Sequence, residues 1–446
     1  MNTASTKQES LFPLFFRYVS ANVLGMIGFS CYILADTFFI ARGIGADALA
    51  ALNLALPAYS LMNGTGLMIG MGAAARYSLS AAQPKDKIHQ TIFTHAPYLS
   101  IPAIAIFSAA GALIPGQIAH VLGANGETIG YATDYLRVLL IFSPLFLGNN
   151  LLTCFVRNDG APGLSMAGMI TGSLTNIVLD YVFVYPLGMG MTGAAIATAT
   201  APVVSMAVLS AHFIKKNNRF RVLSGVHFSG KCWLDICALG VSSLISELSS
   251  GIVIIVFNFL ILSLNGNTGV AAYGIIANIA LVLVAVFTGI AQGIQPIVSK
   301  CAAAGNMKDS SENSAVRSIR RYALISALLL ALIAYTAVTV WSVPIADLFN
   351  RDHNPALTEI AAGGMKIYFI SLFFSGINIV TASFLSSADR PKRAFAVSIL
   401  RCFVLIIPAA WILSRLAGLT GIWMAVPVTE GIVCVLALIF LFHLTE

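Results

Sequence analysis

The chain has 446 residues, of which 58% are hydrophobic and 10% are charged, and its formal net charge is +7. Soluble domains carry about 25% charged residues, so this composition excludes an ordinary soluble globular protein. The mean hydropathy of +0.87 is typical of a protein whose helices lie in a lipid bilayer.

Apolar runs of bilayer-crossing length follow one another along the whole chain. We therefore predict an all-α integral membrane protein with twelve transmembrane helices. The runs lie near 14–41, 50–75, 92–114, 134–156, 162–186, 191–214, 234–262, 270–298, 321–343, 366–387, 394–414 and 419–443.

Lys and Arg gather on one side of these predicted helices. With both termini inside, nineteen of the 25 basic residues fall on the inner side, Arg157 among them, and five fall outside. Arg401 lies within a run. This asymmetry predicts a multi-pass protein of the cytoplasmic (inner) membrane with both termini in the cytoplasm. The positive charge is then a topology signal, so we expect the lipid bilayer and no nucleic acid as a partner.

Cysteine and glycine patterns indicate no catalytic chemistry. The seven cysteines have no metal-ligand spacing, and most fall within predicted helices, which favours buried, reduced thiols. The Gly-rich segments 45–53 and 70–76 lack the lysine of a phosphate-binding loop. We expect neither an enzyme nor an organic cofactor.

An internal repeat divides the chain. GADALAALN at 45–53 aligns without gaps with GNTGVAAYG at 266–274, an offset of 221, and MTGAAIATA at 191–199 aligns with LTGIWMAVP at 419–427. The repeat predicts an N-lobe at 1–214, a basic cytoplasmic linker at 215–231 and a C-lobe at 232–446. Because six helices separate the copies, the two lobes run parallel and enclose a central cleft.

The motifs that carry the repeat resemble those of a known transporter family. GADALAALNLALP follows an Asp-bearing first helix, GIAQGIQPIVS lies in the eighth and GLTGIWMAVPVTE enters the twelfth. Together they resemble the MATE (multidrug and toxic compound extrusion) family over essentially the whole chain. The acid on the first helix, with Asn and Asp on the fifth, is similar to the DinF-type branch. One departure is Ala21–Asn22, which stands where family members often carry a helix-bending proline.

The resemblance implies cation-coupled export of cationic, amphipathic drugs by an antiporter, which we expect to be a monomer. The alternative is a flippase for lipid-linked precursors in the same superfamily. That function would need several basic residues for a pyrophosphate, and the predicted helices offer Arg401 against four acids. A membrane-embedded enzyme or a channel is a further alternative.

Four carboxylates and one guanidinium lie inside the apolar runs. A charged side chain at membrane depth costs at least about 2.5–3.5 kcal/mol, so it usually faces a cavity or a partner. These residues are therefore the first candidates for a functional site: Asp36, Asp180, Glu247, Glu430 and Arg401.

The N-lobe acids are predicted to form the coupling-ion site. Asp36 and Asp180 lie at similar depth, Asn176 shares the helix face of Asp180, and Thr198 lies on the next helix. Burial and a second nearby carboxylate both favour protonation of a carboxyl group, and oxygen ligands also suit sodium. The resemblance assigns the cation site to these same four residues. Whether the ion is H⁺ or Na⁺ stays open, and they are metal ligands only if it is Na⁺.

The C-lobe charges are predicted to face the substrate. Arg401 is long enough to reach Glu430 or to extend toward the inner interface, and both alternatives stay open. If they pair, Glu247 remains as an unmatched acid suited to a cationic drug. The candidate substrate-binding residues are Asn149, Asn150, Glu247, Gln292, Gln295, Arg401 and Glu430.

Overall fold

The computed structural model describes residues 11–80, 88–214, 218, 220, 229–304, 314–350 and 354–442. Every regular element in these ranges is a helix. The predicted linker at 215–231 falls largely outside the described residues, as do residues 1–10.

The helices follow one another with short connections. Their bounds are α1 Leu11–Gly43, α2 Ala46–Ser80, α3 Ile88–Leu113, α4 Pro115–Val121, α5 Ile129–Ile141, α6 Ser143–Asn158, α7 Pro162–Val184, α8 Gly190–Ile214, α9 Gly230–Ala304, α10 Ser314–Val340, α11 Ser342–Phe349, α12 Pro355–Tyr368, the 3₁₀ turn Phe369–Ser371, α13 Leu372–Ser387, α14 Pro391–Ile399, the π-helical turn Leu400–Val404 and α15 Ile406–Phe442.

The all-helical membrane fold is confirmed, and the structure is consistent with twelve crossings. Within the described ranges, nine helical stretches are long and apolar enough to cross a bilayer, and the pair α5–α6, bent by 51°, makes a tenth. The 35-residue α2 and a break inside the stretch 391–441 bring the crossings to twelve.

Glycines break the chain at equivalent places in the two halves. Gly45 (φ 131°) ends the turn before α2, and Gly266 (φ 60°), 221 residues later, interrupts α9. Gly190 (φ 57°) opens α8, and Gly418 (φ 57°), 228 residues later, interrupts α15. Positive φ is strained for residues with a Cβ, so glycine occupies these reversals. The offsets are those of the sequence repeat, and the two halves therefore follow the same path.

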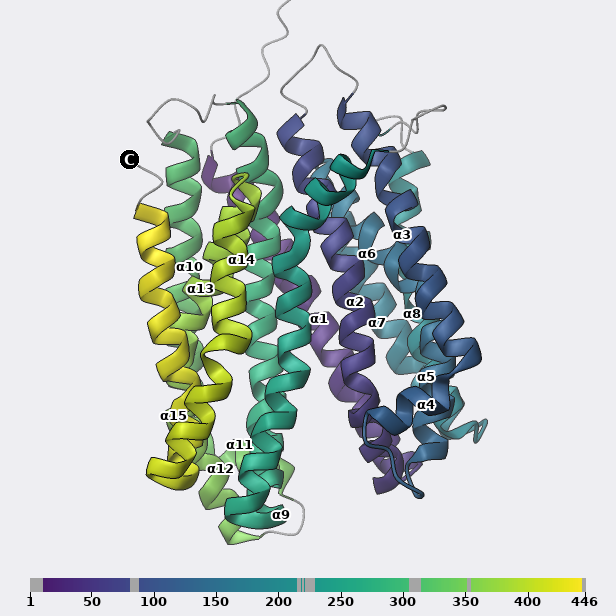
Figure 1. Ribbon diagram of the computed structural model, residues 1–446, viewed down its shortest axis with the longest axis vertical. Helices are drawn as coiled ribbons and strands as arrows, with labels where there is room; N and C mark the ends of the chain where they lie inside the picture. Colours follow the sequence, from purple (N-terminus) through teal and green to yellow (C-terminus); the bar gives the residue numbers. More distant parts are fainter. Residues whose placement is uncertain are drawn as a thin grey trace, which may run out of the picture.

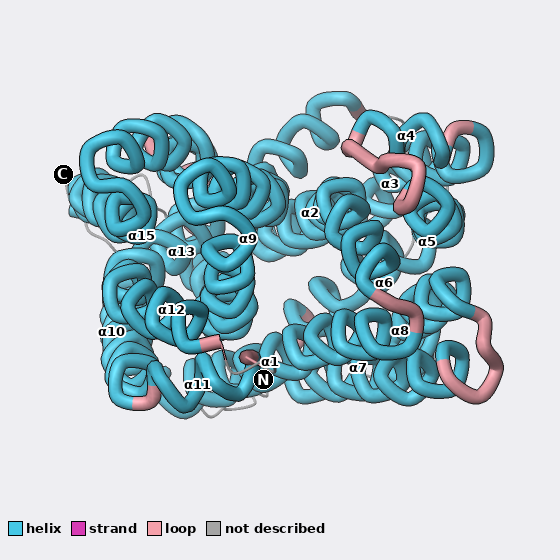
Figure 2. Tube along the Cα trace, turned by 90° about the horizontal axis from the view of Figure 1, so that it is seen from below, coloured by secondary structure: helices cyan, strands magenta, loops and turns pink. Residues whose placement is uncertain are grey.

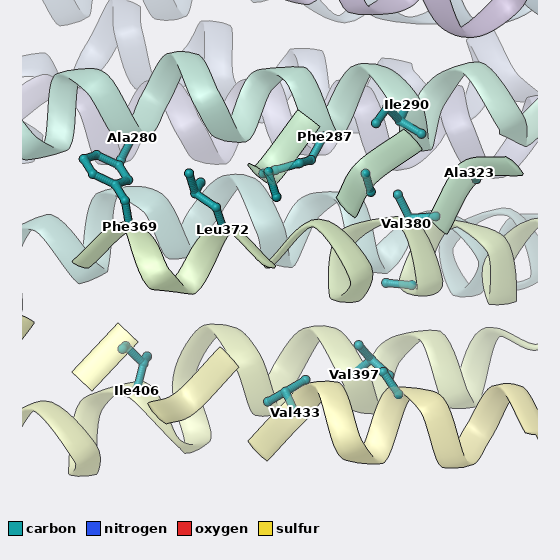
Figure 3. Close-up of a cluster of buried hydrophobic side chains, with 14 of the residues drawn as sticks. Ala280, Phe287, Ile290, Ala323, Phe369, Leu372, Val380, Val397, Ile406 and Val433 are labelled. Atoms are coloured by element: carbon teal, nitrogen blue, oxygen red, sulfur yellow. The ribbon is translucent and has the colours of Figure 1, made fainter. Parts of the chain in front are cut away.

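The helices form two groups side by side, with α1 at their boundary (Figures 1 and 2). We refer to α1–α8 as the N-lobe and to α9–α15 as the C-lobe. The C-lobe core contains Phe287, Leu372 and Val433 (Figure 3). It also contains Phe15 and Tyr18 of α1, so the first turns of α1 pack against the C-lobe while its later part contacts α7.

The lobes are in tight contact at one end. We call this the linker end, marked by Ser80, Ile214 and Gly230, and the opposite one the far end. A Cβ at Gly72 of α2 would clash with the backbone oxygen of Ile236 of α9. Small residues allow such close helix packing in a membrane.

Gly240 of α9 makes the reciprocal contact, because a Cβ there would clash with the backbone oxygen of Met68 in α2. Gly240→Ala is therefore expected to destabilise the protein by about 1–3 kcal/mol, as overpacking does elsewhere. Thermal unfolding of the purified protein in detergent measures this. Gly363→Ala is the control, since a Cβ at Gly363 meets no atom within 4 Å. Equal melting temperatures for the two variants would contradict the prediction.

Candidate functional site

A cavity of about 970 Å³ lies between the lobes. Its lining runs from Gly123 and Asn125, near the far end, to Gln295 and Ser387, toward the linker end. The lobes touch at the linker end and diverge toward the far end, at the bottom of Figure 1. The lining of the cavity thus extends into the region of the far end, where the lobes are apart.

Three of the predicted acids line this cavity: Asp36, Glu247 and Glu430. Arg401 lines it as well, with Met26, Phe29, Leu281 and many other apolar side chains. Such a mixture of apolar walls and a few charged groups is typical of a small-molecule site. Its acidic excess suits a positively charged ligand.

The N-lobe residues predicted as a cation site lie together. Asp36 is 6% exposed, Thr198 is 3% exposed, and Asn176 and Asp180 are fully buried. The Asn176 amide forms hydrogen bonds with both Asp180 and Thr198 when its nitrogen faces Asp180. It then donates to Asp180 Oδ2 at 3.1 Å and accepts from the Thr198 backbone nitrogen at 3.3 Å. The sequence thus correctly grouped α7 and α8 around one amide.

Two carboxylate oxygens in this cluster have no hydrogen-bond partner among the described residues. They are Asp36 Oδ1 and Asp180 Oδ1, and the charges of the two residues interact. Unpaired buried carboxylates are costly unless a proton or cation neutralises them. Within the described ranges, no group of three or more His, Cys, Asp or Glu side chains is placed to hold a metal.

Tyrosines line the cavity beside the acidic cluster. Asp36 and Thr198 line the cavity, as do Tyr32, Tyr59 and Tyr135. The hydroxyls of Tyr32 and Tyr59 lie 3.0 Å apart. Of the two carboxylates of the cluster, Asp36 is the one that lines the cavity.

Sequence reasoning did not select Tyr59 or Tyr135. Both lie in apolar helices like many other aromatic residues, and no local pattern marks them. Their place beside Asp36 follows from helix packing alone.

In the C-lobe, Arg401 and Glu430 form an ion pair. Arg401 Nε lies 2.6 Å from Glu430 Oε1, and both side chains are largely buried. Asn378 of α13 completes the group by donating to Glu430 Oε2 at 2.7 Å and to its backbone oxygen at 2.9 Å. Of the two arrangements left open for Arg401, the structure has the pair. Arg401 lies in a π-helical turn, a feature often found at functional sites.

Glu247 contacts the N-lobe through amides. Asn63 of α2 donates to Glu247 Oε2 at 3.2 Å, and Asn150 of α6 donates to Asn63 Oδ1 at 2.8 Å. Asn149 is nearby and also lines a small side cavity with Asn150 and Glu247. No ion pair of Glu247 is found among the described residues, so it remains the unmatched acid that the sequence predicted.

The two predicted glutamines differ in their contacts. Gln292 and Gln295 both line the large cavity. Both amide atoms of Gln295 lack a partner within the described part of the chain, whereas Gln292 Oε1 accepts from Arg157 at 2.7 Å.

Arg157 corrects a prediction from the sequence. It was placed among the basic residues of the inner surface, but it is 0% exposed and lies between the lobes. Arg401 is therefore not the single basic residue buried in the molecule. Arg157 is the next-to-last residue of α6, where a hydropathy pattern cannot distinguish a surface residue from a buried one.

Two parallel six-helix lobes around a cleft that carries buried acids define a membrane transporter rather than an enzyme. The MatE family model matches residues 22–182 and 243–412, one stretch in each lobe. The chain therefore belongs to the MatE family. Its assignment to the DinF-type branch stays a prediction.

Relatives and solved structures agree with this family. The multidrug export protein MepA of Staphylococcus saprophyticus is 24% identical over 453 residues, covering 99% of this chain and 95% of MepA. MepA of Staphylococcus aureus strain MRSA252 is 24% identical over 441 residues, with the same coverage.

Among solved structures, an outward-facing multidrug resistance MATE transporter of the MOP superfamily has a TM-score of 0.88. It is 21% identical, and the match covers 97% of this chain and 95% of that one. A MOP superfamily transporter from Pyrococcus furiosus, with a binding pocket of reverse polarity, has a TM-score of 0.89 at 20% identity. That match covers 98% and 97% of the two chains. At these sequence identities, the matches show that the fold is shared.

Proposed function

We propose that this protein is a secondary antiporter of the cytoplasmic membrane that exports cationic, amphipathic organic compounds in exchange for H⁺ or Na⁺. The name of the MepA relatives supports multidrug export. The observation that carries the proposal is the buried pair Asp36 and Asp180, each with one carboxylate oxygen that has no partner among the described residues, beside a cavity lined by further acids.

The mechanism follows from differential binding. A proton or sodium ion at Asp36 and Asp180 neutralises their charge and favours one arrangement of the lobes, whereas a drug in the cavity favours another. The linker end faces the cytoplasm, as the excess of Lys and Arg predicts. The described state then exposes the cavity to the outside, where drug leaves and the coupling ion enters.

The flippase alternative has less support. Among the described residues that line the large cavity, Arg401 is the basic one, and Glu430 already pairs with it. A pyrophosphate would therefore meet an acidic surface.

Efflux from vesicles under an imposed pH gradient, and then under a sodium gradient, tests the proposal. Accumulation of a fluorescent organic cation driven by one of these gradients is the expected result. Absence of accumulation under both gradients, with protein correctly inserted, would refute the antiport, and binding of a polyprenyl-pyrophosphate analogue would support the flippase.

Glu247→Gln is expected to weaken the binding of monocationic drugs by about tenfold, since one charge pair in a partly dry site contributes about 1–2 kcal/mol. An uncharged amphipathic compound of similar size is the control, and its binding should change little. Equilibrium binding of labelled compounds to purified protein measures both. Equal losses for the two compounds would indicate that Glu247 acts on cavity shape and not through charge.

A further inference from the structure

Arg157 is the largest fully buried side chain in the described structure, and the hydrogen-bond acceptors found for it among the described residues are all uncharged. Its Nη1 donates to Asn22 Oδ1 at 2.8 Å and to Gln292 Oε1 at 2.7 Å. Its Nη2 lies 3.0 Å from Met71 Sδ and 3.6 Å from Cys154 Sγ, and its Nε has no partner among the residues that the structure describes. A buried guanidinium normally has an anionic partner. Here its acceptors are neutral.

The position of Arg157 between the lobes explains which helices supply these partners. Met71 on α2 and Gln292 on α9 are 221 residues apart, the offset of the repeat, so they are equivalent positions of the two lobes. One guanidinium contacts both. Arg157 therefore lies close to the pseudo-two-fold axis.

The surrounding contacts close the linker end. Gly289 and Gly293 of α9 pack directly on the backbone of α1, because a Cβ at either would come within 2.6–2.8 Å of the α carbons of Val23 and Val19. One residue beyond Arg157, the backbone oxygen of Asn158 accepts from Lys300 Nζ at 2.6 Å. Contacts of α6 with α1 and α9 thus span the closed end.

We propose that Arg157, with Asn22 and Gln292, is a releasable latch that holds the lobes together at the linker end. In the described state the guanidinium has lost its water and gained only neutral acceptors. When the lobes part, Gln292 leaves and water hydrates the charge again, so the penalty of burial is recovered. Because the acceptors are neutral, the closed state is not stabilised so strongly that the lobes cannot part. A buried carboxylate in their place would stabilise the closed state too strongly.

The proposal rests on the proposed transport cycle for its role, but its test needs no substrate. Two matched variants each place one carboxylate beside the guanidinium. Gln292→Glu adds it on α9 of the C-lobe, whereas Cys154→Asp adds it on α6, the helix that carries Arg157 itself. Only the first can tie the lobes together.

The populations of the two states can be measured as spin-label distances. Labels at Gly163→Cys and Lys392→Cys report the linker end, since both positions are exposed at helix starts there. Native Cys31, Cys232, Cys237 and Cys301 are replaced by Ser for this purpose. The protein is measured in nanodiscs without drug.

Gln292→Glu is expected to raise the ratio of closed to open linker ends by about tenfold, because it replaces a bond between a cation and a neutral amide with a bond between two opposite charges in a poorly hydrated place. Gln292→Leu should lower the ratio, because it removes an acceptor from a buried charge. Cys154→Asp should not raise it. In an Arg157→Met background, Gln292→Glu should lose its effect.

A ratio unchanged by both Gln292 variants would overturn the latch, as would a Gln292→Glu effect that persists without Arg157. An equal rise for Cys154→Asp would show that neutralisation, rather than a tie between the lobes, favours closure. These outcomes are independent of drug efflux, so failure of the proposed antiport and failure of the latch are distinguished.

Discussion

Asp36→Asn and Asp180→Asn are each expected to reduce ion-driven efflux by more than about tenfold, the scale of coupling between linked sites. Either change removes one of the two carboxyl groups of the cluster. The other groups of the cluster are an amide and a hydroxyl, which cannot take over its charge. The protein should still fold, because a neutral amide is less costly in this buried place than an unpaired carboxylate. Drug uptake into inverted vesicles under the driving gradient measures the effect.

Asp47→Asn is the matched control, since Asp47 is exposed at the start of α2 and lies outside the cluster. It should leave efflux within about twofold of the unmodified protein, as surface substitutions usually do. Size-exclusion profiles in detergent establish that all three variants fold. Full efflux by both cluster variants would contradict the assignment of Asp36 and Asp180 to the coupling ion. Loss of folding would indicate that the cluster serves to stabilise the structure.

Glu430→Leu is expected to destabilise the C-lobe by about 3–5 kcal/mol, because it leaves Arg401 buried without its counter-ion. The double variant Arg401→Met with Glu430→Leu should recover most of this loss, since a buried ion pair can often be replaced by apolar residues. Thermal unfolding of the four proteins in a double-mutant cycle measures the coupling between the two positions.

If the pair serves only to neutralise charge, the stable double variant should also bind drugs normally. A stable double variant that no longer binds organic cations would instead assign Glu430 to the substrate. Additive melting shifts for the two single changes would show that the pair contributes nothing to stability.

Much of this fold is predictable from the sequence because its signals are local. Each helix carries its own apolar length, and Gly45 and Gly266 mark the same reversal in both halves by residue type alone. The grouping of Asn176, Asp180 and Thr198 was also predictable, because α7 and α8 are adjacent in the chain and antiparallel.

Residues joined by long-range packing were less predictable. Asn63 and Asn378 were not selected, although each donates a hydrogen bond to a predicted acid 184 or 52 residues away. An amide in an apolar helix carries no sign of which helix it will face. Its partner is fixed by packing between elements, which a one-dimensional pattern does not contain.

The sequence by itself determined the class of fold, the two-lobe repeat and the acids within the apolar helices, because hydropathy and burial cost act residue by residue along the chain. Only the tertiary structure decided how those charges are satisfied. It paired Arg401 with Glu430, gave Asp36 and Asp180 no cationic partner within the described part of the chain, and buried Arg157 between the lobes. The physical reason is that the energy of a buried charge depends on its neighbours in space, and these come from helices far apart in the chain.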